Sequence, residues 1–526
     1  MKMVNKVLVV ISVILLSALL VSAVAAQPCS VLNRNGDFNN DGFVDTADFA
    51  YFAIRWLDLS CSESDWCDCV DLDISGGVET EDLKAFSDRW LKAILDGTII
   101  LGRPSDDSVT VNVISNEELD IYFEYGTSSG LYCFQTDVNS IQAGTAFEKV
   151  IDNLQADTRY FYRMCFRATS ETEFGKGPEY SFHTQRVSGS DFVFDVQADS
   201  HIYDHKCNSS LYQITIQNEH KDAPDFVIDL GDTFGDDHDV NISYEEIVQL
   251  HLDQRPYFGF VCHSAPLFLC LGNHEGECGA YMDGTPDNLA IYATKTRKLY
   301  YPNPYPDGGF YTGNTTVEEF VGLPENYYAW EWGDALFVVL DAYRYITTDP
   351  KPKDQWEWSL GEVQYNWFKQ TLEQSNATFK FVFAHHVLGQ CRGAVAWADK
   401  YEWGGNNKDG TWGFDEQRPG WSMPIHQLMV QNGVTIYFQG HDHLFAKEEL
   451  DGIVYQEAPM PSDATYHVGD KNADDYTGDV LCNSGHLRVT VADPNVTVEY
   501  IRAFLPEDQN DTQVNGGVAY SYIITK

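Results

Sequence analysis

The chain has 526 residues, of which 44% are hydrophobic and 14% aromatic, so it can form about three domains with at least one large core. This composition excludes collagen, coiled coil and full disorder. Its 79 acidic residues outnumber 34 basic ones, which gives a formal net charge of -45. Nucleic-acid binding depends on cationic side chains that displace counterions, so a nucleic-acid scaffold is excluded. We expect most of the acids on a solvated surface.

Residues 1–26 have the pattern of a secretory signal peptide. Lys2 and Lys6 flank the start of an apolar run over residues 7–24, and an Ala-x-Ala site closes the segment. The alternative is an uncleaved anchor helix, because the run is at the lower limit for a membrane span. We expect cleavage, a secreted or cell-surface-associated protein, and no membrane span after cleavage.

All twelve cysteines follow this segment. An even number of cysteines in an exported chain predicts disulfides, although their connectivity cannot be read from the sequence. A zinc site at Cys67 and Cys69 is the weaker alternative, because their C-x-C spacing has no matching second pair.

Residues 27–95 contain a repeat with a period of 34 residues. Each copy is an acidic loop followed by an amphipathic helix, over residues 46–57 and 80–91. The loops place oxygen-bearing side chains at positions 1, 3, 5, 9 and 12, as a hard calcium ion requires, with glycine at position 6 for the sharp turn. The proposed ligands are Asp37, Asn39, Asp41, Asp45 and Asp48 in the first loop and Asp71, Asp73, Ser75, Glu79 and Asp82 in the second.

Two such units in tandem, each with aspartate where an EF-hand ends in glutamate, resemble the dockerin family. The resemblance implies a small α-helical module that binds Ca2+ and docks into a cohesin-type receptor on a scaffold or cell surface. The alternative is that calcium only folds a small acidic domain that has no partner.

Residues 96–186 change to short alternating runs separated by turn residues, for example over residues 109–113 and 121–125. Their length and spacing predict a β-sandwich. The segments FEYGTSSG and ADTRYFYRM are similar to a fibronectin type III module of the kind that precedes the catalytic domain of purple acid phosphatases. We expect this domain to be a spacer and packing partner without catalytic residues.

Residues 187–526 contain five apolar runs, each followed at once by residues of metal-ligand type. Such runs, bounded by glycine and separated by helical segments such as 361–374, are typical of buried strands in an α/β domain. Polar groups at the ends of such strands meet at one edge of the sheet. They occur here as Asp199 and His201, Asp232, Asn273 to Glu275, His385 and His386, and His441 and His443.

Taken in order, the motifs Asp-x-His, Gly-Asp, Gly-Asn-His-Glu, His-His and Gly-His-x-His resemble the calcineurin-like metallophosphoesterase superfamily. The resemblance implies a four-layer αββα domain with two divalent transition metal ions (Zn, Mn or Fe) bridged by Asp232. A hydroxide between the ions would attack phosphorus in line, while His274 would contact the phosphoryl group and protonate the leaving oxygen. His386 is expected to be structural. The remaining implied ligands are Asp199, His201 and His443 for the first ion and Asn273, His385 and His441 for the second.

Two departures separate the chain from purple acid phosphatases. Their Asp-x-Gly motif is Asp-x-His here, ending in His201, and Gly235 occupies the position of their tyrosine ligand. The ligands therefore indicate an ordinary metallophosphoesterase, whereas the preceding β domain suggests the purple acid phosphatase group.

Two long irregular segments, residues 276–332 and 388–423, are expected to be functional loops. Their basic side chains Arg297, Arg392 and Arg418 are candidates for binding phosphate oxygens. The aromatic residues of these loops would stack on a sugar or base, or else pack the loops against the core.

We therefore expect an exported two-metal phosphatase that acts on extracellular organic phosphate esters, either small molecules or polymer ends. A phosphodiesterase or nucleotidase is the alternative within the same class, since it would share every motif. A non-catalytic cell-surface binding module is a third hypothesis. The complete set of ligand positions favours an enzyme over this third hypothesis.

Overall fold

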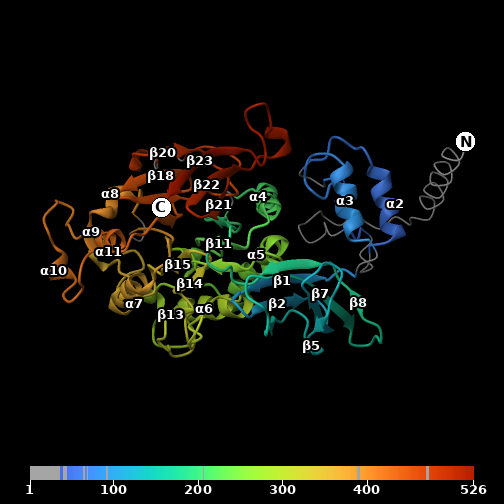
Figure 1. Ribbon diagram of the computed structural model, residues 1–526, viewed down its shortest axis with the longest axis horizontal. Coiled ribbons are helices and arrows are strands. Elements are labelled where there is room, and N and C mark those ends of the chain that lie inside the picture. The colour runs from blue at the N-terminus through green and yellow to red at the C-terminus, as the bar shows by residue number, and fades with distance from the viewer. Residues whose placement is uncertain are drawn as a thin grey trace, which may run out of the picture.

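The structure is a computed structural model that describes residues 36–38, 44–62, 66–67, 69–90, 93–204, 207–387, 391–468 and 473–526. The signal segment predicted at residues 1–26 lies outside this part of the chain, as do the predicted calcium ligands Asn39 and Asp41. A small helical module, a β-sandwich and a large α/β domain follow one another along the chain (Figure 1). Within the described residues, no helix combines the length and the apolar character needed to cross a membrane.

The helical module contains α2 (Thr46–Arg55) and α3 (Thr80–Asp88), which begin 34 residues apart. Both are shorter at the C-terminal end than the periodicity predicts, because the backbone leaves the helix at Trp56 and Arg89. A disulfide joins Cys61 to Cys67, and Cys69 is also disulfide-bonded. The prediction of disulfides is therefore confirmed for this module and is wrong for the remaining described cysteines. The other described cysteines are free thiols, namely Cys133, Cys165, Cys207, Cys262, Cys270, Cys278, Cys391 and Cys482.

The β-sandwich packs two antiparallel sheets around one apolar core that includes Leu101 and Val111 from one sheet and Ile121 and Tyr162 from the other. One sheet has the order β1 (Gly97–Gly102), β2 (Val109–Ser115) and β6 (Phe147–Ile151). The other has the order β4 (Phe134–Gln135), β3 (Leu119–Gly126), β7 (Arg159–Ala168) and β8 (Gly175–Lys176), with β5 (Asn139–Ile141) paired to β3 and β9 (Tyr180–His183) paired to β7.

The α/β domain contains two large mixed sheets. The six-stranded sheet has the order β12 (Leu267–Leu269), β11 (Phe226–Asp229), β10 (Phe192–Gln197), β21 (Gly485–Ala492), β22 (Asn495–Arg502) and β23 (Val518–Thr525). The eight-stranded sheet has the order β13 (Thr312–Gly313), β14 (Tyr328–Trp332), β15 (Ala335–Val339), β16 (Phe379–Phe383), β17 (Ile436–Gln439), β19 (Ile453–Glu457), β18 (Phe445–Leu450) and β20 (Asp479–Leu481).

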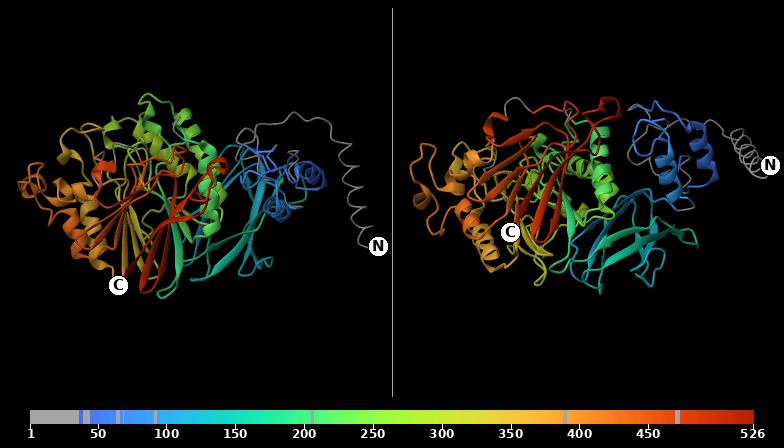
Figure 2. Two further views of the ribbon diagram at one scale, coloured as in Figure 1. Left: turned by 90° about the horizontal axis from the view of Figure 1, so that it is seen from above. Right: turned by 45° about the horizontal axis from the view of Figure 1, so that its top comes forward.

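The two sheets face each other across a dry core of aromatic rings, in which Phe194 contacts Phe337 and Phe381. Helices α4 (Ser209–Asp222) and α5 (Tyr244–Cys262) cover the outer face of the six-stranded sheet. Helices α7 (Gly361–Gln374) and α11 (Ile425–Gln431) cover the eight-stranded sheet. The predicted α/β class is confirmed, and its layers are helix, sheet, sheet and helix (Figure 2).

The two segments predicted as irregular loops contain regular structure, which corrects the prediction. Residues 276–332 include α6 (Leu289–Tyr300), whose first turn is capped by the side chain of Asn288. This helix buries Leu289 and Ile291, so these two side chains belong to the core rather than to a substrate surface. The second segment contains the short helices α8 (Val395–Ala398), α9 (Tyr401–Gly404) and α10 (Phe414–Gln417).

Both N-terminal parts pack against the α/β domain. The helical module shares an apolar cluster with α4 and with Leu505, and Gln217 on α4 donates a hydrogen bond to the carbonyl oxygen of Leu72. The β-sandwich contacts α5, where the buried Arg255 donates to Thr98 (2.8 Å) and Asn112 (3.0 Å). Burial lowers the pKa of Arg255 to about 10. The sandwich thus acts as a packing partner, as the sequence predicts.

Candidate active site

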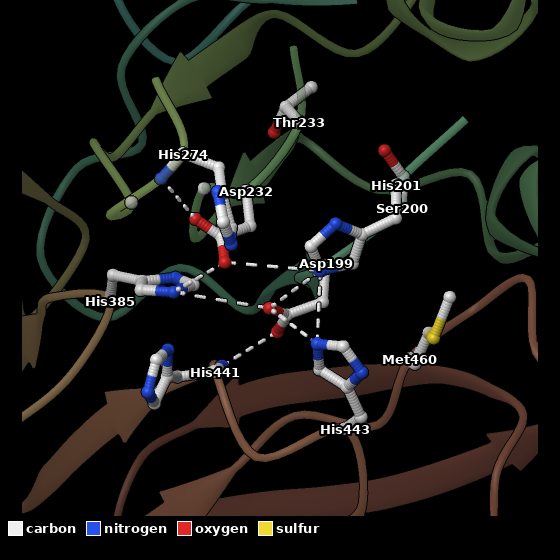
Figure 3. Close-up of polar contacts among 12 residues, drawn as sticks. Asp199, Ser200, His201, Asp232, Thr233, His274, His385, His441, His443 and Met460 are labelled. Atoms are coloured by element: carbon white, nitrogen blue, oxygen red, sulfur yellow. Dashed lines mark hydrogen bonds and ion pairs between the residues drawn. The ribbon is translucent and has the colours of Figure 1, made fainter. Parts of the chain in front are cut away.

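The proposed metal ligands lie where neighbouring strands end. Strands β10, β11 and β12 pair in parallel, as do β15, β16 and β17, so each set presents its carboxyl ends at one edge. Asp199 and His201 follow β10, Asp232 follows β11, and His441 follows β17. The two edges meet, so that side chains from both sheets face each other in Figure 3.

The turns that carry these ligands adopt left-handed backbone conformations, which non-glycine residues rarely take. Each such residue costs on the order of 1–3 kcal/mol and persists only where its surroundings enforce it. The chain tolerates this strain at five ligands, and each lies in a turn that follows a strand. The φ values are +60° at Asp199, +46° at His201, +57° at Asp232, +83° at His441 and +55° at His443.

The first cluster contains Asp199, His201 and His443. Their ligand atoms lie within 4.8 Å of one another. His201 Nε2 and His443 Nε2 are 2.9 Å apart, and Asp199 Oδ1 is 3.6 Å and 3.4 Å from them. Bonds of about 2.0–2.1 Å to one ion bring two ligand atoms to about this separation.

The second cluster contains Asp232, His385 and His441, which are all buried and again have ligand atoms within 4.8 Å of one another. His385 Nδ1 donates a hydrogen bond to the carbonyl oxygen of Leu230 (3.0 Å), which leaves Nε2 facing the site. His385 Nε2 lies 3.2 Å from Asp232 Oδ2.

Asp232 lies between the two clusters, as expected of a bridging ligand. Its Oδ2 is 3.2 Å from His385 Nε2 and 3.8 Å from His201 Nε2. Its Oδ1 faces away and accepts a hydrogen bond from the backbone N–H of His274 (2.8 Å). One oxygen is thus positioned between the clusters while the other fixes the carboxylate (Figure 3).

Four of the predicted ligands have an unsatisfied polar atom. Within the described part of the chain, Asp199 Oδ1, Asn273 Oδ1, His385 Nε2 and His441 Nε2 are buried without a hydrogen-bond partner. Leaving a buried polar atom unpaired costs about 1–3 kcal/mol. Asp199, His385 and His441 belong to the two clusters, and Asn273 precedes His274, whose backbone N–H donates to Asp232, so the four atoms fit two bound cations.

The charges of the site also fit bound cations. Burial alone would lower the pKa of His385, but the nearby carboxylates of Asp232 and Asp199 outweigh it and raise that pKa to about 10. Burial and the neighbouring His386 and His385 lower the pKa of His441 well below its usual range, so its imidazole is neutral and able to bind a metal. The field of the carboxylates thus favours positive charge at the centre of the site.

His274 lies beside the two clusters and is held by Asp237. Its Nδ1–H donates a hydrogen bond to Asp237 Oδ1 (2.6 Å), and about a third of its side chain is exposed. Burial alone would lower the pKa of His274, but Asp232 and Asp237 raise it to about 9. The imidazole is therefore protonated near neutral pH, with Nε2 remaining to contact an anionic group.

Besides Asp237, sequence reasoning missed two supporting residues. Glu275 accepts hydrogen bonds from the backbone N–H groups of Asp232 (2.9 Å) and Thr233 (2.6 Å), and Tyr203 hydrogen-bonds to His201 Nδ1 (2.6 Å). Glu275 is the last residue of a motif that the sequence does show. Its contacts cross 42 residues or more, so only the fold reveals them.

The three arginines proposed for phosphate binding have different positions. Arg392 is the one next to the site, where it donates to the carbonyl oxygen of His441 (2.5 Å) and pairs with Asp442 (2.8 Å). Its side chain is 43% exposed, so part of the guanidinium is accessible.

Arg297 and Arg418 are structural, which corrects the prediction for both. Arg297 is fully buried and forms a bidentate ion pair with Glu277. Arg418 pairs with Glu402 and donates to the carbonyl oxygen of Trp356 (2.6 Å). Buried cations require such partners, and sequence alone does not show them.

His386 is buried, and its ring lies 4.8 Å from that of His441, next to the second cluster. This position agrees with the structural role predicted for it. Cys67 is joined to Cys61, so the alternative of a zinc site at Cys67 and Cys69 is wrong.

The helical module forms a separate candidate site in its second loop. Asp71, Asp73 and Asp82 have carboxylate oxygens within 4.8 Å of one another. Burial and the charge of Asp82 raise the pKa of Asp71 to about 7. Ser75 donates its hydroxyl to the carbonyl oxygen of Gly77 (3.1 Å), and Glu79 is exposed.

The two loops of the module share a hydrogen-bond pattern. Asp48 Oδ1 accepts from the backbone N–H of Phe38 (2.6 Å), and Asp82 Oδ1 accepts from that of Leu72 (2.6 Å). Asp48 Oδ2 accepts from Asp45, as Asp82 Oδ2 accepts from Glu79. The repeat read from the sequence is thus a structural repeat. The buried Asp37 lies in the described part of the first loop.

Comparisons with known proteins agree with this geometry. Residues 192–445 match the family model for calcineurin-like phosphoesterases. No curated protein matches the chain. The fold is similar to that of the purple acid phosphatase PPD1 from yellow lupin (Lupinus luteus) seeds, at 16% identity and a TM-score of 0.55 over 81% of this chain and 74% of that one. It is also similar to PhoD, at 13% identity and a TM-score of 0.57 over 82% and 90% of the two chains.

The fold, the candidate site and the family match over residues 192–445 support a metal-dependent phosphoesterase. Within that class, the similarity to the calcineurin-like phosphoesterases covers residues 192–445, which is just under half of the chain.

Proposed function

We propose that the protein is a secreted phosphatase that hydrolyses extracellular organic phosphate monoesters at a two-metal site. One observation carries the proposal. Within the described residues, four predicted ligand atoms are buried without hydrogen-bond partners, and three of them belong to the two clusters formed where the sheets meet. Two divalent ions such as Zn, Mn or Fe would supply a nucleophile at neutral pH and neutralise charge on the phosphoryl oxygens.

The residues of the chain have distinct tasks in this proposal. Asp199, His201 and His443 would hold one ion, Asn273, His385 and His441 would hold the other, and Asp232 would serve both. His274 Nε2–H donates a hydrogen bond to the phosphoryl group and gives its proton to the leaving oxygen. Asp237 keeps the His274 ring in one orientation through the 2.6 Å bond to Nδ1. Arg392 is positioned to contact a substrate oxygen on the side of His441.

The test compares a chromogenic phosphomonoester with the matching bis-ester on the full chain loaded with Zn or Mn. We expect the monoester to be the better substrate. Faster hydrolysis of the bis-ester would favour a phosphodiesterase or nucleotidase. Hydrolysis of neither would favour a non-catalytic binding module.

The same assay with Asp232→Asn tests the site itself. We expect kcat to fall by at least about 1,000-fold, because the shared ligand contributes several kcal/mol through the two ions. Asp191→Asn is the matched control, since Asp191 is an exposed acid that precedes β10. Equal activity of Asp232→Asn and the wild type would contradict the proposal.

We further propose that residues 27–95 bind Ca2+ and dock into a cohesin-type receptor. The carboxylates of Asp71, Asp73 and Asp82 support calcium binding. Three apolar side chains around the end of α2 are free to contact a receptor, with exposed fractions of 59% for Ile54, 62% for Leu57 and 70% for Leu59. Calorimetric titration of the full chain with calcium tests calcium binding. The absence of calcium uptake would contradict both calcium binding and docking.

A further inference from the structure

A second group of metal-ligand side chains lies on the outer face of the six-stranded sheet, beneath α4. Asp195 on β10 pairs in register with Arg488 on β21, and His486 lies two residues before Arg488 on the same face. The neighbouring residues on each strand, Phe194 and Leu487 among others, point to the opposite face and into the core between the sheets. Helix α4 adds Glu219 and Asp222 from above.

Three of these side chains converge on one point. His486 Nε2 is 2.8 Å from Asp222 Oδ2 and 4.0 Å from Asp195 Oδ2, and the three ligand atoms lie within 4.8 Å of one another. The side chains of Asp195 and His486 are completely buried, and that of Asp222 is 8% exposed. The group is therefore shielded from water.

This group contains unpartnered polar atoms. Within the described residues, both oxygens of Asp195, both oxygens of Glu219 and Nδ1 of His486 are buried without a hydrogen-bond partner. Asp229 on the neighbouring strand is a useful contrast, because Gly231 (3.0 Å) and Gln197 (2.8 Å) donate hydrogen bonds to its carboxylate. The sheet thus satisfies one buried carboxylate fully and leaves Asp195 without a donor.

The charges of the group are also unbalanced. Three carboxylates (Asp195, Glu219 and Asp222) face one guanidinium, that of Arg488, which is 2.6 Å from Asp222 and also pairs with Glu499 (2.9 Å). Burial, followed by repulsion from Asp222 and Glu219, raises the pKa of Asp195 well above its usual range. The carboxylates must therefore either carry protons or share a cation.

We propose that Asp195, Asp222 and His486 bind one divalent transition metal ion that is separate from the pair at the strand ends. One imidazole and two carboxylates are a donor set that suits Zn2+, Mn2+ or Fe2+. Glu219 is the nearest source of a further oxygen ligand on α4. The ion would fasten α4 to β10 and β21, behind the strand that leads into Asp199.

Anomalous diffraction from crystals of the full chain, grown with Zn2+ in the presence of excess Ca2+, tests the proposal directly. We expect a peak between Asp195, Asp222 and His486 in addition to the peaks of the catalytic pair. Data collected on both sides of the zinc absorption edge separate zinc from calcium. Peaks at the catalytic pair alone would overturn the proposal and indicate protonated carboxyl groups at this place.

Zinc analysis of purified variants gives a second measurement. Asp195→Asn and His486→Gln should each bind one zinc equivalent fewer than the wild type and unfold at a lower temperature, while phosphoester hydrolysis remains. Glu499→Gln is the matched control, because it removes a neighbouring acid that lies outside the ligand set, and it should keep the wild-type zinc content. Unchanged zinc content in both ligand variants would contradict the proposal.

Discussion

His274 depends on Asp237 for its orientation. The Asp237 carboxylate accepts a hydrogen bond from Nδ1–H of the ring (2.6 Å) and so directs Nε2 toward the two clusters of proposed metal ligands. We expect Asp237→Asn to lower kcat by about 10- to 100-fold, the effect typical of losing an outer partner of an active-site histidine. KM should change little, because Asp237 does not contact the substrate. Steady-state kinetics with a phosphate ester measures both constants.

Asp239→Asn is the control for this variant, since Asp239 is an exposed acid two residues farther along the chain. Both variants should unfold at the same temperature as the wild type. A rise in KM with unchanged kcat in Asp237→Asn would mean that Asp237 binds substrate rather than positioning His274.

At the scale of residues, the sequence predicts the metal ligands better than it predicts the side chains that hydrogen-bond to the residues of the site. Asp199, Asp232 and His441 follow apolar runs directly, so strand ends and chemical type are enough to find them. Asp237 and Tyr203 reach the site through loop geometry that no short motif records. Glu277, the ion-pair partner of Arg297, is 20 residues away along the chain. The sequence therefore does not show that this arginine is structural rather than a phosphate ligand.

Glu275 joins two loops that follow strands. Its carboxylate lies after β12 and accepts hydrogen bonds from the backbone of the turn after β11, including Asp232 and Thr233. Glu275→Gln replaces one accepting oxygen with a donating NH2 group that faces these N–H groups. We expect the affinity for the catalytic metals to fall by about 10- to 100-fold, as measured by metal titration.

The control is Glu319→Gln, because Glu319 is exposed. Wild-type metal affinity in Glu275→Gln would show that the turn after β11 holds its conformation without the carboxylate.

Phe194 is central to the packing of the two sheets. It is completely buried, and its ring contacts rings from both sheets, including Phe226 and Phe337. We expect Phe194→Ala to lower the free energy of unfolding by about 3–5 kcal/mol, because it leaves a cavity in a rigid aromatic core. Denaturant unfolding measures this change.

Phe134→Ala provides the comparison, since Phe134 is 55% exposed and its removal should change the free energy of unfolding by no more than about 0.5 kcal/mol. Equal effects of the two substitutions would contradict the central role of Phe194.

The strands that carry ligands are predictable at the scale of elements. The apolar run predicted before His385 is β16, and the helix predicted at residues 361–374 is α7 with the same bounds. The sequence does not predict helix α6, because the segment around it is rich in glycine and proline, which favour turns. The pairing of β21 with β10 joins strands that are far apart in the chain, and local patterns carry no information about such contacts.

At the scale of the whole molecule, the helical module is docked on the α/β domain. Leu505 is buried in the cluster that joins the module to α4. We expect Leu505→Ser to weaken this contact, because large-to-small substitutions of this kind cost about 2–5 kcal/mol. Limited proteolysis should then release the module several-fold faster, while phosphoester hydrolysis is retained.

Val514→Ser is the matched control, because Val514 is a 55% exposed residue of the same C-terminal region. Identical rates of release from wild type and Leu505→Ser would show that other contacts hold the module.

Composition predicts the surface of the molecule only in part. The acidic surplus indicates a solvated surface, yet the fold also buries acids such as Asp195, Glu219 and Glu457. Total charge does not distinguish an exposed acid from a buried one, because burial depends on strand register and helix packing.

The division of the ligands between the two sheets constrains when the ions can bind. Asp199 and Asp232 belong to the six-stranded sheet, whereas His385 and His443 follow strands of the other. A growing chain cannot assemble the second cluster before residue 441 is available or the first before residue 443, and both need the two sheets to have docked. Since an unfolded chain rarely contains a preformed site, metal loading is a late event in the life of the molecule. The compartment in which folding finishes therefore determines which metals the finished protein contains.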